Sequence, residues 1–184
     1  WPLALACALA ILVGGLFGFV LERLAVRPFA HQPNSIGWML TTIAVGIMVE
    51  SYATIETQGY ALPLPSPGVA GSVQILGAGL YPQELAIPVL ALAAMLGLQA
   101  LQRHTLIGRA MQAVAPNKNA AALMGINVDL VVAFSFSLAS LLGAAAGVLI
   151  APVVQASATM GLLPGLKGFA VAIMGGITSA PEAP

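Results

Sequence analysis

The chain has 184 residues, of which 59% are hydrophobic and only 7% are charged, and its formal net charge at pH 7 is zero. Soluble domains carry about 25% charged residues, so this composition, with a mean hydropathy of +0.98, excludes a water-soluble fold and predicts a chain that lies largely in lipid. The balanced charge also argues against nucleic acid as a partner, because binding it requires a basic surface.

The first predicted membrane span runs roughly from Pro2 to Leu21, and residues 1–21 carry no charge. At about 1.5 Å per residue this segment reaches about 32 Å, enough for a hydrocarbon core of about 30 Å. A signal peptide would have basic residues before a shorter apolar core, whereas here they follow it. We therefore predict a true span, in a chain that lacks its natural start.

Residues 22–35, "ERLAVRPFAHQPNS", contain two arginines and two prolines and are predicted to form a loop. The second span then runs roughly from Ile36 to Ile55. Four of its residues recur every four positions and form a polar stripe along one helix face: Thr42, Gly46, Glu50 and Thr54. A carboxyl group within a membrane costs roughly 3 kcal/mol and usually faces an interior or an aqueous path. The stripe therefore either lines a translocation pathway, or a neutral Glu50 makes a structural hydrogen bond to a neighbouring helix.

The third span runs roughly from Leu85 to Leu101, after a connection rich in glycine and proline, and the fourth roughly from Leu130 to Ala151. The apolar run at residues 168–181 is too short to cross alone. It predicts either a re-entrant half-helix or a span cut off by the end of the chain. The predicted fold is all-α: a polytopic transmembrane helix bundle with about four full spans.

A ridge of small side chains follows one face of the fourth span, because small residues recur every four positions there: Ser135, Ala139, Gly143, Gly147 and Ala151. Such ridges let helices approach closely in lipid, where packing drives association. We expect this face to pack against another span or subunit. Gly14 and Gly18 form a shorter ridge in the first span, which is either a packing site or ordinary glycine content.

Basic residues predict the orientation of the spans. Lys and Arg concentrate on the cytoplasmic side of membranes, and five of the six lie in the connections after the first and third spans: Arg23, Arg27, Arg103, Arg109 and Lys118. These connections lie on the same side of a four-span bundle. Residues 22–35 and 102–128 are therefore predicted to be cytoplasmic, with Lys167 as the exception.

The connection at residues 102–128 is predicted to contain two short helices. Thr105 can cap a helix that ends before Pro116, and Asn117 or Asn119 can cap a second one through Met124. Gly125 suits a left-handed helix stop. The apolar run from Ala120 to Met124 then either contacts a partner or folds back under the chain's own spans, while the basic residues suit lipid headgroups.

Motifs for metal binding and catalysis are absent from the sequence. It has no cluster of His, Cys, Asp and Glu at metal-ligand spacing, no G-x-S-x-G nucleophile elbow and no G-x-x-x-x-G-K-[ST] phosphate loop. We therefore predict no catalytic residue, no metal and no cofactor. The missing motifs leave an intramembrane enzyme as an alternative, without a visible catalytic set.

Several segments resemble permease subunits of branched-chain amino acid ABC importers. They are "TLIGRAMQAVAPNKNAAALMGINVDLVVAFSFSLASLLGAAAGVL", "ERLAVRPF", "MLTTIAVGIMVE" and "GLLPGLKGFAVAIMGGITSAPEA", in the family's order and over nearly the whole chain. Two positions depart from the family pattern: Gln112 stands where a basic residue is common, and Thr178 replaces a glycine. Family members extend further at both ends, so the chain is expected to be a fragment that lacks spans.

The resemblance implies a single, partial transmembrane permease domain over residues 1–184, with residues 102–128 as its cytoplasmic coupling loop. It assigns contact with an ATPase to six residues of this loop: Gly108, Arg109, Asn119, Ala121, Gly125 and Asn127. It also implies a transporter subunit rather than an enzyme, with ATP hydrolysed by a separate subunit. The implied complex has a second permease subunit, identical or different, two ATPase subunits and a periplasmic substrate-binding protein, assembled in a bacterial plasma membrane. The alternatives are a sugar-type ABC permease, which shares some of these motifs, and a secondary transporter or channel that uses no ATP.

Overall fold

A computed structural model describes residues 2–30, 37–63, 73–75, 78–80 and 82–174. The helices in these ranges are α1 (Pro2–Leu21), the π-helical η1 (Glu22–Val26), α2 (Arg27–Ala30), α3 (Gly37–Glu56), α4 (Pro82–His104), α5 (Leu106–Val114), α6 (Lys118–Leu123), α7 (Val128–Val154) and α8 (Leu162–Met174). Strands β1 (Val73–Ile75) and β2 (Ala78–Leu80) pair as an antiparallel hairpin between α3 and α4.

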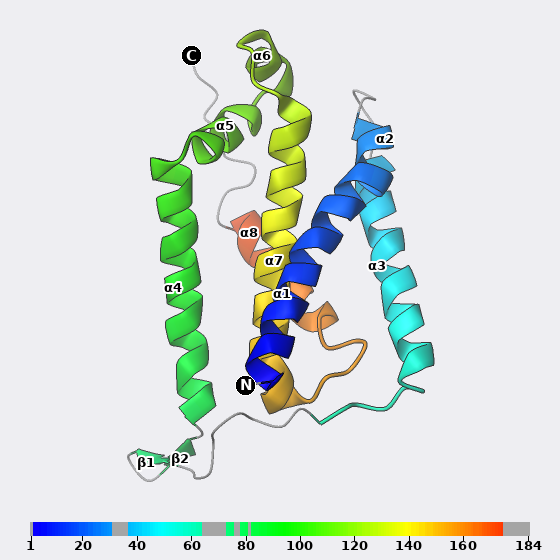
Figure 1. Ribbon diagram of the computed structural model, residues 1–184, viewed down its shortest axis with the longest axis vertical. Coiled ribbons are helices and arrows are strands. Elements are labelled where there is room, and N and C mark those ends of the chain that lie inside the picture. The colour runs from blue at the N-terminus through cyan, green and yellow to red at the C-terminus, as the bar shows by residue number, and fades with distance from the viewer. Residues whose placement is uncertain (1, 31–36, 64–72, 76–77, 81, 175–184) are drawn as a thin grey trace.

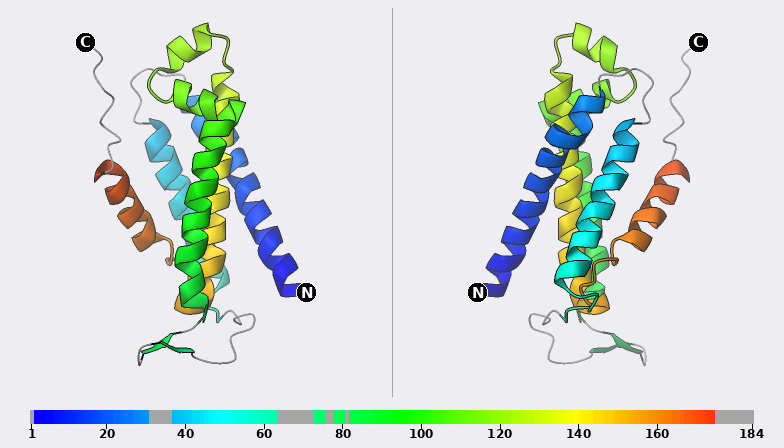
Figure 2. Two further views of the ribbon diagram at one scale, coloured as in Figure 1. Left: turned by 90° about the vertical axis from the view of Figure 1, so that its left-hand side faces the viewer. Right: turned by 90° about the vertical axis from the view of Figure 1, so that its right-hand side faces the viewer.

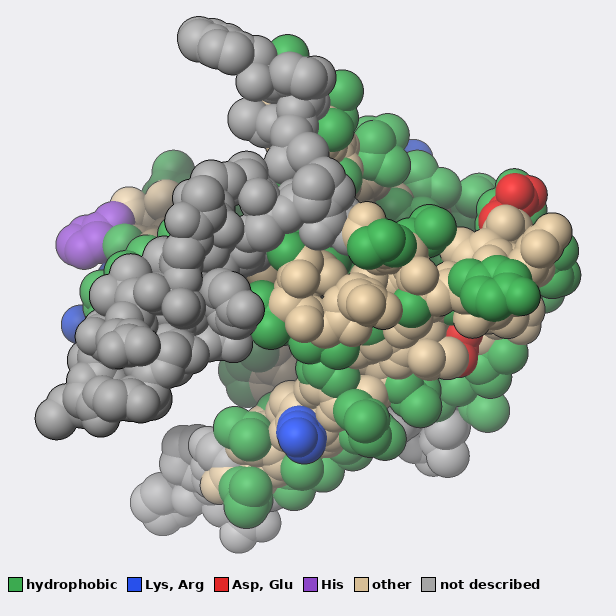
Figure 3. Space-filling model, turned by 90° about the horizontal axis from the view of Figure 1, so that it is seen from below, with side chains coloured by type: hydrophobic (Ala, Val, Ile, Leu, Met, Phe, Trp, Pro, Cys, Tyr) green, Lys and Arg blue, Asp and Glu red, His purple; other side chains and the backbone are tan. Residues whose placement is uncertain are grey.

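The fold is an all-α membrane helix bundle. Its long helices α1, α3, α4 and α7 run between two ends (Figure 1): α2, α5 and α6 lie at one end, and the short β-hairpin lies at the other. α8 diverges from the bundle axis (Figure 2). Viewed from the hairpin end, the described surface shows hydrophobic side chains beside polar ones and backbone, and few charged groups (Figure 3).

The predicted spans match the long helices. Within the part of the chain that the structure describes, three segments are long and apolar enough to cross a membrane: Leu5–Val26, Ala86–His104 and Val128–Val154. α3 has 20 residues and occupies the position of the predicted second span, and its crossing stays a prediction. The shorter α8 begins at Leu162, before the predicted start at residue 168. Residues 175–181 of the predicted re-entrant segment lie outside the described residues.

The prediction of a loop from residue 22 is wrong for residues 22–30, which continue the first helix. After α1 the chain widens into the π-helical turn η1, in which the N–H of Arg27 donates to the carbonyl oxygen of Glu22, and α2 follows. Pro28 lacks an N–H and would crowd the carbonyl of the preceding turn of a regular α-helix. A wider π turn at this point accommodates the proline without ending the helix.

Close packing of α1 against α7 forms the centre of the bundle. A Cβ atom at Gly18 would lie 2.6 Å from the carbonyl oxygen of Phe136, and one at Gly14 would collide with the Cβ of Ala144. The hydroxyl of Ser137 also donates a 2.9 Å hydrogen bond to the carbonyl oxygen of Gly15. The glycines of α1 therefore allow the backbone contact that drives helix association in lipid.

A second connection joins α3 and α7 at the hairpin end. Leu62, beyond α3, and Ala156, beyond α7, exchange two backbone hydrogen bonds of 2.9 and 3.0 Å. The residue before Ala156, Gln155, has a φ of +68° and a ψ of 140°, a conformation that favours glycine. This bridge links the exits of two helices that are about 90 residues apart in the chain, far beyond the reach of local structure.

Candidate functional site

The connection between α4 and α7 contains the two predicted short helices, α5 and α6, which end at Val114 and Leu123, one residue before the predicted ends. The hydroxyl oxygen of Thr105 accepts the N–H of Gly108 at 3.0 Å and so caps α5. The side chain of Asn117 accepts the N–H groups of Asn119 and Ala120 and caps α6, which decides between the two predicted asparagines. Gly125 has a φ of +83°, which confirms the left-handed stop. We call residues 105–127 the docking loop.

Gly108 holds the docking loop against the end of α4. The residue is buried, and a Cβ atom there would collide with the carbonyl oxygen of Leu101. The backbones of α4 and α5 can therefore meet at a sharp angle only with glycine at this position. The family resemblance assigned Gly108 to the contact with an ATPase, and that role stays a prediction.

A small apolar core fixes the docking loop to the start of α7. Ala121, only 2% exposed, packs with Val114 and Val131, and the partly buried residues around them come from the same elements: Ala110, Met111, Ile126, Val128 and Val132. Leu123 and Met124 point the other way and are 90% and 81% exposed. The apolar run therefore divides: one face folds back under the chain's own helices, and the other is open.

The six predicted coupling residues divide in the same way. Gly108 and Ala121 are buried in the chain, while four are exposed: Arg109, Asn119, Gly125 and Asn127. Asn127 also caps α7, since its side-chain oxygen accepts the N–H of Leu130 at 3.2 Å. Exposed apolar residues beside exposed polar ones give the loop an outward surface that can meet either a protein or lipid headgroups.

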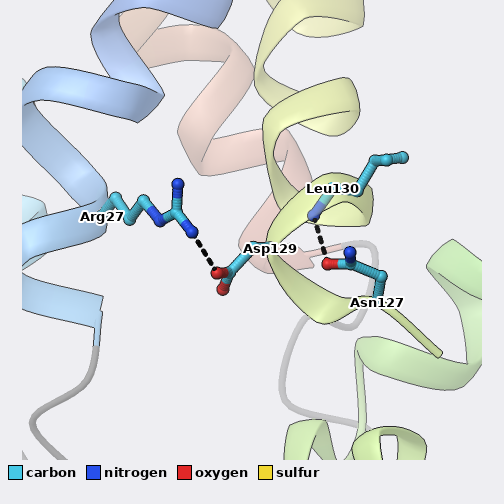
Figure 4. A network of polar contacts seen from close by, with 4 residues as sticks. All are labelled: Arg27, Asn127, Asp129 and Leu130. Carbon is cyan, nitrogen blue, oxygen red and sulfur yellow. Dashed lines mark hydrogen bonds and ion pairs between the residues drawn. The ribbon is translucent and has the colours of Figure 1, made fainter. Parts of the chain in front are cut away.

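An ion pair, which sequence reasoning missed, joins the start of α7 to α2. The guanidinium of Arg27 lies 2.8 Å from the carboxylate of Asp129, and the side chains are 35% and 43% exposed (Figure 4). Glu22 on η1 is only 3% exposed and interacts electrostatically with both charges. The sequence signal was Asp129 in the first turn after a cap, one of only six acidic residues in the chain. The pair brings residues 22–30 and the docking loop to one end of the bundle.

The predicted polar stripe lies along α3. Thr42 and Glu50 are half-buried, Gly46 has open space where a side chain would be, and the Thr54 hydroxyl donates to the Glu50 carbonyl oxygen at 2.8 Å. α3 contacts η1 and α2 near its own beginning. The four residues share one element, and their role as a pathway lining stays a prediction.

The predicted small-residue ridge of α7 does not form the contact with α1. Ala139 and Gly143 are exposed, and Gly143 has open space around it. At the two ends of the ridge, the Ser135 hydroxyl donates to the Val131 carbonyl oxygen, and Gly147 faces the side chain of Met160. The contact with α1 instead uses the neighbouring face of α7, which Gly14 and Gly18 approach. The middle of the ridge thus stays open to another helix.

No group of three His, Cys, Asp or Glu side chains that could hold a metal ion is found among the described residues. The ionisable residues that do gather, Glu22, Arg27 and Asp129, form a charge cluster at the end of the bundle. Such an arrangement can fix the relative positions of helices.

Comparison with known proteins places the chain in a family. The family model described as branched-chain amino acid transport system / permease component matches residues 1–183. The high-affinity branched-chain amino acid transport system permease protein LivH of Salmonella typhimurium is 30% identical over 179 residues, 95% of this chain and 58% of that protein. LivH of Escherichia coli K12 gives the same identity and coverage.

The permease protein BraD of Pseudomonas aeruginosa is 30% identical over 183 residues, 97% of this chain and 59% of that protein. The chain thus spans less than two thirds of the length of these relatives. No solved structure shows a significant match. The family match extends over nearly every residue and agrees with the helix bundle, so the chain belongs to the family of branched-chain amino acid transport system permease components.

Proposed function

We propose that the chain is a permease subunit of an ATP-driven importer for branched-chain amino acids, in which residues 103–127 dock on a separate ATPase. The observation that carries the proposal is the outward face of the docking loop, where Leu123 and Met124 are almost fully exposed at one end of the bundle. The core around Ala121 holds this face on α7. A large exposed apolar surface on a firmly anchored loop is typical of a protein interface.

The partners proposed are a second permease subunit, two ATPase subunits and a periplasmic binding protein in a bacterial inner membrane. Residues 22–35 and 102–128 would face the cytoplasm, where the basic residues favour them and where ATP is available. The open part of the α7 ridge, Ala139 and Gly143, would contact another span or the second permease.

Transport would proceed by alternating access, with ATP-driven movement passed through the docking loop to the helices. The α3 stripe around Glu50 would line the pathway. Its support is the half-buried carboxyl group within the 20-residue helix α3, because an ionisable group inside a membrane is costly without an aqueous or polar environment.

A pull-down of the ATPase by the full-length permease tests the docking. Leu123→Asp, Met124→Asp and Arg109→Glu should reduce recovery about tenfold or more, because each places a charge or reverses one on the outward face. Tyr60→Asp is the control, since Tyr60 is 71% exposed but follows α3 near the other end of the bundle. Recovery of all three loop variants at the wild-type level would exclude this face as the ATPase contact.

Uptake of radiolabelled leucine by the reconstituted complex tests the transport activity. Uptake should require both ATP and the binding protein, and unlabelled isoleucine and valine should compete whereas ribose should not. Competition by ribose alone would instead assign a sugar-type permease, and uptake without the ATPases would assign a secondary transporter or channel.

A further inference from the structure

The ion pair between Arg27 and Asp129 connects α2 to the first turn of α7, which directly follows the docking loop in the chain. We propose that these two residues are positioning residues for energy coupling: they hold α2 to the first turn of α7, so that movement of the docking loop reaches α1 and α3. The proposal rests on the proposed function, because it needs a docking partner that moves the loop.

The first link in this route is rigid. Asp129 lies in the first turn of α7, two residues before Val131, which packs against Val114 and Ala121 of the docking loop. Asn127 caps the same turn by accepting the N–H of Leu130. Val131 of the loop core, the cap residue Asn127 and Asp129 therefore lie together at the start of α7. A displacement of the docking loop would displace Asp129 with it.

The second link crosses from α7 to α2 through the 2.8 Å contact between the Arg27 guanidinium and the Asp129 carboxylate (Figure 4). Glu22, almost fully buried one turn before Arg27, adds a second acidic group beside the guanidinium. Arginine suits this position because its planar guanidinium is permanently charged and binds a carboxylate in a fixed orientation. The contact between α2 and α7 therefore has a defined geometry.

The third link runs from this segment into α3. η1 contacts α1, α3 and α7, and α2 contacts α3, while α3 carries the polar stripe with Glu50. η1 is a π-helical turn, and such turns are frequent at functional sites, where they re-aim the residues around them. Movement of Arg27 can thus reach the stripe on α3 through α2 and η1. This route is separate from the contact between α1 and α7 in the middle of the bundle.

Stability alone does not explain the pair. Both side chains are more than a third exposed, and ion pairs that water screens contribute little to folding. The glycine contacts between α1 and α7 hold those helices together without it. The pair spans 102 residues in sequence and joins the helical segment that continues α1 to the first turn of α7, which favours a role in their relative position.

Leucine uptake and ATP hydrolysis by the reconstituted full-length complex test the proposal, through the variants Asp129→Asn, Arg27→Gln and their combination. We expect each single variant to lower leucine uptake per ATP hydrolysed about five- to tenfold, within the range of typical coupling energies. ATPase recovery in the pull-down and the thermal midpoint should stay at wild-type values. The double variant should be no worse than either single one, because the two residues act as one unit.

Arg23→Gln is the matched control, since it removes the same charge from the same segment at an exposed position, and it should transport as the wild type does. Arg27→Lys should restore part of the coupling because the charge is kept. Unaltered coupling in Asp129→Asn, or additive losses in the double variant, would overturn the proposal while a coupled wild type upholds the proposed function. A wild-type complex without ATP-dependent leucine uptake would contradict the proposed function itself and the role of the pair with it.

Discussion

At the residue scale, backbone requirements and caps decide the shape of the docking loop. Thr105, Asn117 and Asn127 each accept N–H groups at the start of a helix, and Gly125 ends one with a positive φ. Each such cap contributes about 1 kcal/mol. Because three caps and one stop fall within 23 residues of chain, the loop can hold its two bends with only a small apolar core.

Gly108→Ala should destabilise the protein by about 1–3 kcal/mol, because the added methyl group meets the Leu101 carbonyl, which cannot rotate away. Thermal unfolding in detergent measures the effect. Gly97→Ala in α4 is the control: nothing lies within 4 Å of its Cβ position, so it should gain up to about 1 kcal/mol of helix propensity. Equal behaviour of the two variants would show that the close approach at Gly108 is unimportant.

Gln155→Gly should stabilise the protein by about 1 kcal/mol. Gln155 adopts a φ of +68°, which costs a residue with a side chain more than it costs glycine. The thermal midpoint of the purified variant should therefore rise, with the Leu62–Ala156 bridge intact. A fall in the midpoint would mean that the side chain of Gln155 makes a contribution that outweighs the strain.

At the element scale, α1 and α7 form the contact on which the remaining helices depend. Gly14 and Gly18 approach α7 with no room for a side chain, and Ser137 adds a hydrogen bond to the α1 backbone. Many apolar side chains of α1 are exposed. In a membrane they gain no hydrophobic free energy from contact with another helix, because the lipid tails that they leave are equally apolar. Close packing and hydrogen bonding therefore stabilise this pair of helices.

Gly18→Leu should separate α1 from α7 and lower stability by about 3 kcal/mol or more, because the new side chain meets the Phe136 carbonyl and Ser140. The measurement is the thermal midpoint together with protease sensitivity of the α1 region. Gly97→Leu introduces the same side chain where α4 has open space, and it should neither lower the thermal midpoint nor increase protease sensitivity. A stable Gly18→Leu protein would contradict the observed packing.

At the scale of the whole molecule, the bundle has one end with the docking loop and the charge cluster and another with the hairpin and the Leu62–Ala156 bridge (Figure 1). α3 is thus connected to α7 at both ends, through Arg27 and α2 at one and through Leu62 at the other. Between these connections lies the stripe that includes Glu50. This arrangement suits a helix that moves as a unit when its ends are displaced.

Glu50→Gln keeps the shape of the side chain and removes its charge. If the charge serves the pathway, leucine uptake should fall by about tenfold, equivalent to about 1.4 kcal/mol, with unchanged expression. Glu56→Gln at the exposed end of α3 is the control and should transport normally. Unchanged transport and unchanged expression of Glu50→Gln would exclude any role for its charge.

Local patterns in the sequence were sufficient to predict the helix bundle, the four long helices and the cap at Thr105, because hydropathy and capping depend on residues close in the chain. They limited the cap of α6 to Asn117 or Asn119, and the structure decides for Asn117. The continuation of the first helix past residue 22 was missed, since charges and prolines resemble a loop, and only the π turn shows how Pro28 is accommodated. The sequence also does not determine which residues of the docking loop are buried and which are exposed, because this depends on which face of α6 packs against α7.

The sequence by itself determined that this is a membrane protein of helices with a short-helix loop at one end. The tertiary structure alone decided that Ala121 faces inward and Leu123 outward, that Gly14 and Gly18 meet α7, and that Arg27 pairs with Asp129. The physical reason is range: composition, periodicity and caps act over a few residues, whereas these contacts join segments up to 102 residues apart and depend on how the helices pack.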